Sequence, residues 1–311
     1  MSKIKGLIAA AYTPMDAKGE LNLKVVKSYA AFLQANGVKG TFVCGTTGES
    51  TSLTVGERMK VTEAWTCLGL TDFRVIVQVG HNSLKESKRL AKHAQEAGAD
   101  AISVIAPSFF KPAEVVDLIG YCADIASEAP VVPFYFYHIP AMTGVNFGMV
   151  DFLEQVKGRI PNFAGIKFTH ENLMDFGLCL GYKEKRYDML FGRDEILLGA
   201  LCLGAKGAVG STYNFMAPLF NQIIDAFKNG NTEQAGFLQR QVMEFVRVLI
   251  RHGGGVVGGK AIMKLVGVDC GPVRLPLKSV KDTTRLYHDL MQSGFFNYCA
   301  MAKNAEVPGR E

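Results

Sequence analysis

The stretch NFAGIKFTHEN, residues 162–172, places a single lysine inside a short apolar run. Residues 163–168 are bounded by polar residues and are predicted to form a buried strand. Burial removes the hydration of an ammonium, so Lys167 must either reach a carboxylate or lose its proton. A desolvated lysine can attack a ketone as a neutral amine and form a Schiff base. The protonated imine is then an electron sink for breaking or making the adjacent carbon–carbon bond, without a metal.

This chemistry requires a proton shuttle and, for a 2-oxo acid, donors for a carboxylate. The phenol of Tyr137 suits the first role. The N–H groups and hydroxyls of GTTGES, residues 45–50, suit the second, because such loops form anion-binding nests. Both features also have plainer interpretations. Tyr137 lies with Tyr135 in an aromatic stretch and either could be core, while strings such as GTTGES usually form ordinary turns.

The elements that would position these groups form a regular alternation of short apolar runs and longer helical patterns. The predicted strands are residues 6–13, 40–45, 74–80, 101–107, 133–139, 163–169, 188–192 and 207–211. Continuous apolar runs are typical of a parallel sheet that is covered on both faces. Eight strand–helix repeats predict an α/β fold, a closed (β/α)8 TIM barrel. The alternative, a doubly wound open sheet, usually has fewer strands and a glycine-rich fingerprint after the first strand.

Capping signals mark several of the predicted helices. Thr54 with Glu57, and Ser83 with Glu86, each have the spacing of a capping box, and Gly98 is placed to end the second of these helices. After about residue 229 the strand signals stop and three helical patterns follow, over residues 231–254, 259–267 and 280–296. We therefore predict a barrel over residues 1–229 and a C-terminal helical extension over residues 230–311 that packs against it.

In a barrel of this kind, active sites lie at the carboxyl ends of the strands. Five predicted strands end in polar groups that would share this rim, and these groups are GTTGES, Tyr137, Lys167 with Thr169, GRDE (residues 192–195) and GSTYN (residues 210–214). Asp194 could instead cap the helix that follows it. His138 is better explained as a packed histidine than as a ligand, because no second histidine or carboxylate stands at metal-ligand spacing. We expect no metal and no cofactor.

Composition excludes several other classes of protein. The net charge is +5, charged residues are 20% of the chain and no basic block stands out, so nucleic acid is not an expected partner. No apolar run approaches the roughly 20 residues that span a bilayer. The seven cysteines are scattered and odd in number, which favours reduced thiols over a disulfide framework. We predict a cytoplasmic protein.

Four motifs, GTTGES, YHIPAMTGV, GIKFT and FGRDE…GAVGSTYN, stand in an order and spacing that resemble one family. This family is the pyruvate-dependent class I aldolases, which include N-acetylneuraminate lyase and dihydrodipicolinate synthase. The resemblance covers essentially the whole chain and implies a homotetramer. It also implies that Lys167 forms the Schiff base, that Tyr137 moves the proton and that Thr46 and Thr47 hold the substrate carboxylate. The positions that would meet a sugar chain are Thr169, Gly192, Asp194, Glu195 and Ser211.

Within this family the lyase branch is the closer match. The synthases usually carry an arginine for a second carboxylate where this chain has Met142. Many members also have a tyrosine that reaches a neighbouring subunit, in a stretch that here reads PSFFKP with Phe109 and Phe110. The resemblance thus implies reversible cleavage of N-acetylneuraminate to N-acetylmannosamine and pyruvate. The alternatives are another pyruvate-dependent aldolase or dehydratase acting on 2-keto-3-deoxy sugar acids, or a non-catalytic sensor of 2-oxo acids.

Overall fold

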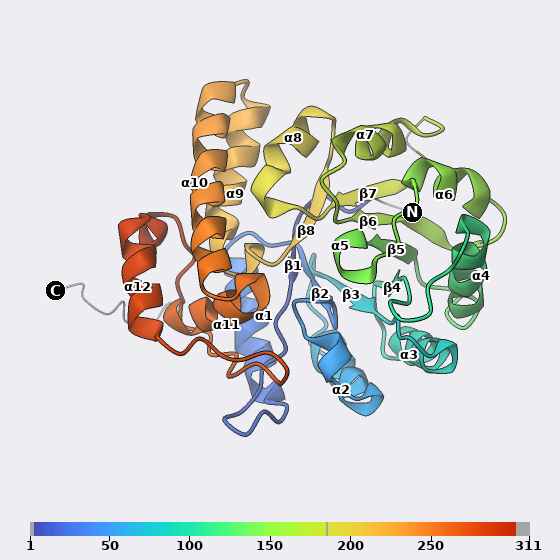
Figure 1. Cartoon of the computed structure of the whole chain (residues 1–311), viewed down its shortest axis with the longest axis horizontal. Helices are drawn as coiled ribbons and strands as arrows, with labels where there is room; N and C mark the ends of the chain where they lie inside the picture. The colour runs from blue at the N-terminus through green and yellow to red at the C-terminus, as the bar shows by residue number, and fades with distance from the viewer. Residues whose placement is uncertain (1–2, 185, 303–311) are drawn as a thin grey trace.

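The computed structural model describes residues 3–184 and 186–302. Over these residues, eight parallel strands pair in chain order and close into a barrel, as the sequence predicts. The strands are β1 (Gly6–Ala10), β2 (Gly40–Val43), β3 (Arg74–Gln78), β4 (Ala101–Ile105), β5 (Phe134–His138), β6 (Phe163–Phe168), β7 (Asp188–Phe191) and β8 (Gly207–Gly210). Closure is direct, because β1 pairs with β8 with Ile8 opposite Val209. Figure 1 shows the helices arranged around this barrel.

The strands of the barrel are followed by helices. They are α1 (Val26–Ala35), α2 (Val55–Thr66), α3 (Leu84–Glu96), α4 (Val115–Ala126), α5 (Pro140–Thr143), α6 (Met149–Val156), α7 (Leu173–Gly181), α8 (Leu197–Cys202) and α9 (Tyr213–Lys228). All of these except the short α5 form the outer layer; α5 lies at the carboxyl end of the barrel, where its residues line one cavity with Thr46 (Figure 1). The capping box of Thr54 and Glu57 is formed in both directions. At Ser83 the structure has one half of the predicted box, a bond from the Glu86 N–H to the Ser83 hydroxyl. Gly98 ends α3 in the left-handed conformation, with φ of 83°.

Strand alternation separates two buried clusters. Side chains such as Ile8, Phe42, Tyr137 and Leu190 contact one another in the barrel interior. Lys167 lies opposite Tyr137 of β5 and Leu190 of β7 in the strand register. Since residues in register share a face of the sheet, the lysine side chain points into the barrel.

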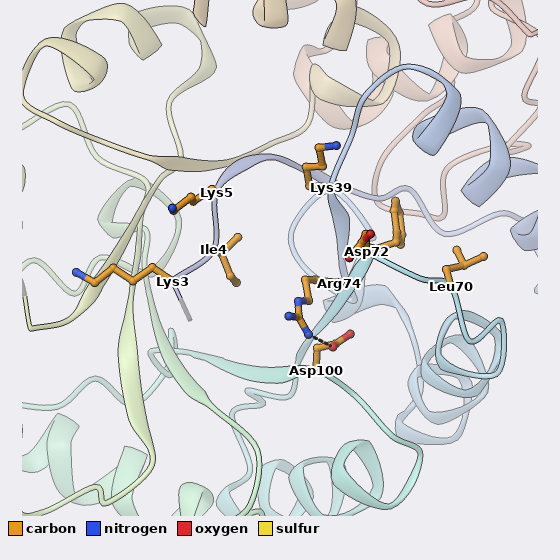
Figure 2. Close-up of a pocket in the computed structure, with 9 residues that line it drawn as sticks. Lys3, Ile4, Lys5, Lys39, Leu70, Asp72, Arg74 and Asp100 are labelled. Atoms are coloured by element: carbon orange, nitrogen blue, oxygen red, sulfur yellow. Dashed lines mark hydrogen bonds and ion pairs between the residues drawn. The ribbon is translucent and has the colours of Figure 1, made fainter. Parts of the chain in front are cut away.

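The amino ends of the strands form the opposite end of the barrel. A cavity of about 340 Å³ lies there, lined by residues that begin or precede β1, β2, β3 and β4. Figure 2 shows Arg74 paired with Asp100 beside Lys39 and Lys5 in this cavity. Because Lys167 stands near the carboxyl end of β6, this cavity is remote from it along the strands.

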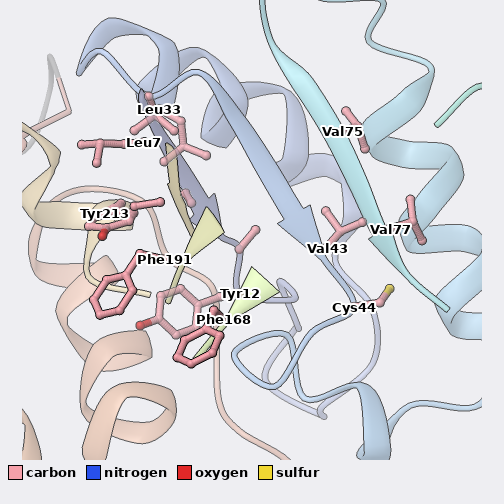
Figure 3. Close-up of a cluster of buried hydrophobic side chains, with 14 of the residues drawn as sticks. Leu7, Tyr12, Leu33, Val43, Cys44, Val75, Val77, Phe168, Phe191 and Tyr213 are labelled. Atoms are coloured by element: carbon pink, nitrogen blue, oxygen red, sulfur yellow. The ribbon is translucent and has the colours of Figure 1, made fainter. Parts of the chain in front are cut away.

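The second cluster joins the outer face of the strands to the helices. Figure 3 shows part of it, including Leu7 of β1, Leu33 of α1 and Val75 of β3. Large rings such as Phe168 and Tyr213 fill the space between strands and helices and are fully buried. This continuous core fixes the strand ends, on which the site depends.

Up to residue 302, three α-helices follow the barrel, α10 (Thr232–Arg251), α11 (Gly254–Leu265) and α12 (Thr283–Gln292), and Figure 1 shows them gathered on one side, beside α9 and α1. Residues 303–311 of the predicted extension lie outside the described residues. No helix in the described part of the chain is long and apolar enough to cross a membrane.

Helix α11 begins earlier than the sequence suggests. Its first residues are glycines, which have low helix propensity, so the predicted helix started near Gly259. In the structure a Cβ at Gly259 would lie 1.9 Å from the Tyr12 hydroxyl oxygen. The same hydroxyl donates to the Gly255 carbonyl at 2.7 Å. Glycines are therefore needed for the close approach of α11 to the end of β1, and tertiary contact overrides propensity.

Candidate active site

Lys167 is buried inside the carboxyl end of the barrel, with 3% of its surface exposed. Its Nζ lies 3.5 Å from the ring centroid of Tyr137 and 4.2 Å from that of Phe42. Burial lowers the pKa of Lys167, and the nearby Tyr137 and Asp194 act in the opposite direction. The surroundings are mainly two aromatic rings, so desolvation dominates and the neutral amine is favoured relative to an ordinary lysine.

Tyr137 and the GTTGES loop meet beside this amine. The hydroxyls of Thr46 and Tyr137 lie 3.4 Å apart, at the limit of a hydrogen bond. The Phe42 ring packs edge-on against Tyr137, with centroids 5.4 Å apart, and fixes the phenol in place. The structure therefore brings together three of the predicted site residues, Lys167, Tyr137 and Thr46, from three different elements.

The loop itself is a compact turn over the carboxyl end of β2. The Glu49 N–H donates to the Thr46 carbonyl at 3.0 Å, and the Ser50 N–H to the Gly45 carbonyl at 3.3 Å. The hydroxyl of Thr13, which follows β1, donates to the Gly48 carbonyl at 2.7 Å. Thr47 is 9% exposed. A turn closed on itself and tied to the neighbouring strand end can hold its hydroxyls in a fixed orientation.

Asp194 is also buried, in the short 3-10 helix η3 (Asp194–Ile196). Its Oδ2 accepts from the Thr212 N–H at 2.9 Å and from the Thr212 hydroxyl at 2.6 Å. Its Oδ1 has no hydrogen-bond partner among the described residues. The carboxylate thus reaches across to the end of β8, which disfavours the interpretation of Asp194 as a simple helix cap. Burial raises the pKa of Asp194 to about 6, and the bond from Thr212 opposes this rise.

The remaining predicted residues lie on the same rim. A Cβ at Gly192 would stand 2.0 Å from the Thr169 hydroxyl oxygen, so glycine is required where these two strand ends meet. A Cβ at Gly255 of α11 would stand 3.1 Å from the Ser211 hydroxyl oxygen, which places Ser211 beside the start of that helix. Glu195 faces Arg193, with their closest oxygen and nitrogen 3.5 Å apart.

Arg193 is held from two sides, because Glu171 pairs with it as well as Glu195. The side chain of Glu195 is 34% exposed. Its pairing with Arg193 orients it. His138 packs between the rings of Phe168 and His170, and burial lowers the pKa of His138 to about 3. A packed histidine is what the sequence predicts at this position.

Next to Thr46 a cavity of about 330 Å³ opens toward Met142, Asn82 and the buried Arg58. Met142 is 61% exposed, and its thioether presents no charge to this cavity. Phe109 and Phe110 directly follow Ser108, which also lines this cavity, and are 77% and 84% exposed.

Sequence reasoning placed Asn214 on this rim, as the last residue of GSTYN, but gave it no role, and in the structure it holds the rim together. Asn214 is fully buried, donates to the Ala10 carbonyl at 2.8 Å and to the Ser211 carbonyl at 2.7 Å, and accepts from Tyr29. It joins the ends of β8 and β1, where the barrel closes. The sequence shows only a polar amide followed at once by an apolar helical pattern. The role of Asn214 could not be predicted from this, because its partner at Ala10 is more than 200 positions away.

A closed eight-stranded barrel with a desolvated lysine, a tyrosine and a hydroxyl-rich loop at the carboxyl end defines a site suited to Schiff-base chemistry on a 2-oxo acid. Comparison with known proteins agrees with this class. The model of the dihydrodipicolinate synthetase family matches residues 3–292, and the chain belongs to this family.

Within the family, the chain is similar to proteins named N-acetylneuraminate lyase. The human protein is 46% identical over 89% of this chain and 88% of its own length. The Xenopus tropicalis protein is also 46% identical, over 94% of this chain and 95% of its own length. The structure of the N-acetylneuraminate lyase, or sialic acid aldolase, from Aliivibrio salmonicida has 41% identity and a TM-score of 0.91, and the match covers 95% of this chain and 98% of that one.

The raised pKa of Asp194 predicts a pH-dependent stability. The folded protein holds the proton up to about pH 6, whereas the unfolded chain releases it near the ordinary value of 3.8. Stabilisation from this group is therefore present at low pH and lost as the pH rises through 6. Asparagine does not titrate. Relative to Asp194→Asn, the free energy of unfolding of the native protein should fall by about 2 kcal/mol between pH 4 and pH 7. Urea unfolding of both proteins at the two pH values measures this, and an equal difference at both would contradict it.

Proposed function

We infer that the protein is a carbon–carbon lyase, a class I aldolase that reversibly cleaves N-acetylneuraminate to N-acetylmannosamine and pyruvate. The observation that carries this is the desolvated Lys167 against Tyr137, in a chain of the dihydrodipicolinate synthetase family that is similar to N-acetylneuraminate lyases along almost its whole length. The fold alone would not decide the activity, because barrels of this kind support many reactions.

The proposed reaction begins with the open-chain 2-oxo acid. Thr46 and Thr47 bind its carboxylate, and the neutral Lys167 amine attacks C2. The Tyr137 phenol gives its proton to the departing hydroxyl, so that water leaves and a protonated imine and the Tyr137 phenolate remain. Tyr137 takes the proton of the C4 hydroxyl. The C3–C4 bond then breaks, its electron pair moves into the iminium, and N-acetylmannosamine leaves as the aldehyde. Tyr137 then gives this proton to C3 of the resulting enamine, and hydrolysis of the imine by water releases pyruvate, the free Lys167 amine and the neutral Tyr137 phenol. The 3.4 Å separation of the Thr46 and Tyr137 hydroxyls supports their action as a unit.

The sugar chain extends over the ends of β6, β7 and β8 in this proposal. Asp194 has one unpartnered oxygen that can accept from a substrate hydroxyl. Glu195 is partly exposed and can do the same, while Ser211 can donate or accept. Thr169 has a buried hydroxyl without a partner among the described residues, and Gly192 leaves room beside it.

Three features argue against the other activities considered. The synthase reaction involves a second carboxylate, and the exposed thioether of Met142 offers it no cation. Asp194 and Glu195 would in addition repel an anionic tail. A sensor of 2-oxo acids would need neither a desolvated amine nor a phenol beside it. Among the alternative substrates considered, the 2-keto-3-deoxy sugar acids, which have a shorter polyol tail, are chemically the most similar to N-acetylneuraminate.

We further propose a homotetramer. Met174 and Leu178 of α7 are 75% and 57% exposed, and Leu203 after α8 is 46% exposed. Phe109 and Phe110 form a second apolar surface, with their rings edge-to-face at 5.0 Å. Two separate apolar surfaces are suited to the two kinds of contact in a tetramer with dihedral symmetry.

A cytoplasmic location and the division into a barrel, residues 1–229, and a helical extension, residues 230–311, complete the proposal. Cys44, Cys122, Cys179 and Cys270 are buried free thiols, as suits a reducing compartment. The division is supported by α10, which packs along α9 at the end of the barrel.

The inference is tested by pyruvate release from a panel of sialic acids and 2-keto-3-deoxy sugar acids, together with borohydride reduction in the presence of pyruvate. We expect N-acetylneuraminate to be the preferred substrate and the added mass to map to Lys167. Lys167→Ala should lose both cleavage and trapping, because it removes the nucleophile. Trapping at another lysine would overturn the assignment of the residue. Efficient condensation of pyruvate with aspartate semialdehyde would overturn the choice of reaction.

Contact with the sugar chain is tested separately by Glu195→Gln. This change weakens an acceptor for the tail hydroxyls, so the KM for N-acetylneuraminate should rise roughly tenfold while pyruvate binding is unchanged. Glu171→Gln is the matched control, because Glu171 pairs with the same Arg193 but is 58% exposed. If both variants lose substrate affinity equally, the effect belongs to the ion pairs with Arg193 and the proposed role of Glu195 is wrong.

A further inference from the structure

A second buried lysine lies near the GTTGES loop, on a different part of the chain. Lys260, in the middle of α11, pairs with Glu49 of the loop, with Nζ and Oε1 2.8 Å apart. Both side chains are 1% exposed. Breaking a pair so fully desolvated leaves an uncompensated buried charge, whereas a surface pair contributes little. This ion pair is therefore a strong constraint between residues 211 positions apart.

The loop needs such a constraint because of its backbone. Cys44, before the loop, and Glu49, within it, both have φ of 55° although neither is glycine. Side chains rarely adopt this left-handed conformation, and it persists where surrounding contacts enforce it. Between these two residues lie Thr46 and Thr47, the proposed ligands of the substrate carboxylate. The conformation of Glu49 thus sets the direction in which the turn presents the two hydroxyls.

The contacts that enforce this conformation come from the C-terminal helical region. Lys260 also donates to the Pro272 carbonyl at 2.7 Å, and the Arg274 N–H donates to the second oxygen of Glu49 at 2.9 Å. The Arg274 guanidinium in turn binds the Glu57 carboxylate of α2 and the Ser52 carbonyl. Both oxygens of Glu49 are therefore engaged by residues that follow the barrel.

Helix α11 is itself fixed against the barrel. Tyr12, after β1, donates to the Gly255 carbonyl, and Gly259 allows its hydroxyl to approach the helix closely. Lys260 directly follows this contact point. The ammonium accordingly has little freedom to follow a moving loop, and the loop is held to a rigid element instead.

We propose that Lys260 is a positioning residue for pyruvate binding, which acts through its buried ion pair with Glu49 to hold the carboxylate-binding turn of Thr46 and Thr47. This rests on the proposed function of the site. It assigns to the C-terminal helical region a role in the reaction, since the residue that holds the turn lies outside the barrel. Lys260 does not contact the reacting atoms in this role, because its donors are directed at Glu49 and Pro272.

Lys260→Met tests the proposal, because methionine keeps most of the length of the side chain and removes the charge. We expect the pyruvate concentration that gives half-maximal borohydride inactivation to rise roughly 10- to 100-fold, as for other displacements of a positioned group. In the condensation direction the KM for pyruvate should rise in parallel, while the KM for N-acetylmannosamine should not change. If Lys260 only stabilised the fold, Lys260→Met would lower the melting temperature and would not raise the KM for pyruvate selectively.

Lys264→Met is the matched control, one turn further along the same helix. Its side chain is 73% exposed and its nearest acid, Asp269, lies 3.5 Å away. We expect native pyruvate dependence in this variant. If Lys260→Met also shows native pyruvate dependence, or if both KM values rise together, the proposal is wrong.

A double variant keeps the test decisive if Lys260→Met does not fold. Glu49→Gln with Lys260→Met removes both charges and leaves no unpaired buried ion. It should still require more pyruvate for trapping, because the turn has lost its anchor, and native half-saturation would overturn the proposal.

The native protein provides the reference. Absence of trapping in the native protein would refute the proposed function and the inference with it, whereas native trapping with an unaffected variant refutes the inference alone.

Discussion

An amine that is cut off from water inside a closed barrel is the constraint on which the rest of this site depends. The charged form of Lys167 loses its hydration, and the Tyr137 and Phe42 rings replace only part of it. The closed sheet makes this possible, because every strand edge is paired and the interior is filled by side chains. A neutral amine follows from desolvation, and its reactivity toward a carbonyl follows from neutrality.

The two buried lysines show how the same fold handles a buried cation in opposite ways. Lys167 has aromatic faces around it, and the nearby Asp194 directs one oxygen to Thr212. Lys260 has a carboxylate at 2.8 Å and a carbonyl at 2.7 Å. The ammonium of Lys260 is therefore held in place by its partners, whereas the desolvated amine of Lys167 forms no such ion pair among the described residues and is available to react. The surroundings of each lysine, rather than burial itself, separate the proposed nucleophile, Lys167, from the proposed anchor, Lys260.

Much of this arrangement was predictable from the sequence, for physical reasons. Parallel strands buried on both faces give continuous apolar runs, so the eight strands were found, and Lys167 stood out as the charge that interrupts such a run. The interactions that complete the site were not predictable. Thr212 reaches Asp194, and Lys260 reaches Glu49, across contacts that no local periodicity encodes. The start of α11 was missed for a related reason. Glycine is required there by the close approach of Tyr12, although glycine has low helix propensity.

The protonation of Lys167 can be measured directly. Lysine labelled with 13C at Cε reports the charge of each amine by its chemical shift, and comparison with Lys167→Arg assigns the resonance. A titration of the native protein without substrate then gives the pKa of this one group. We predict that the pKa of Lys167 lies below the ordinary value of 10.5, because burial disfavours the charged form. A pKa at or above 10.5 would show that the amine is charged at neutral pH, and desolvation could then not make Lys167 the proposed nucleophile.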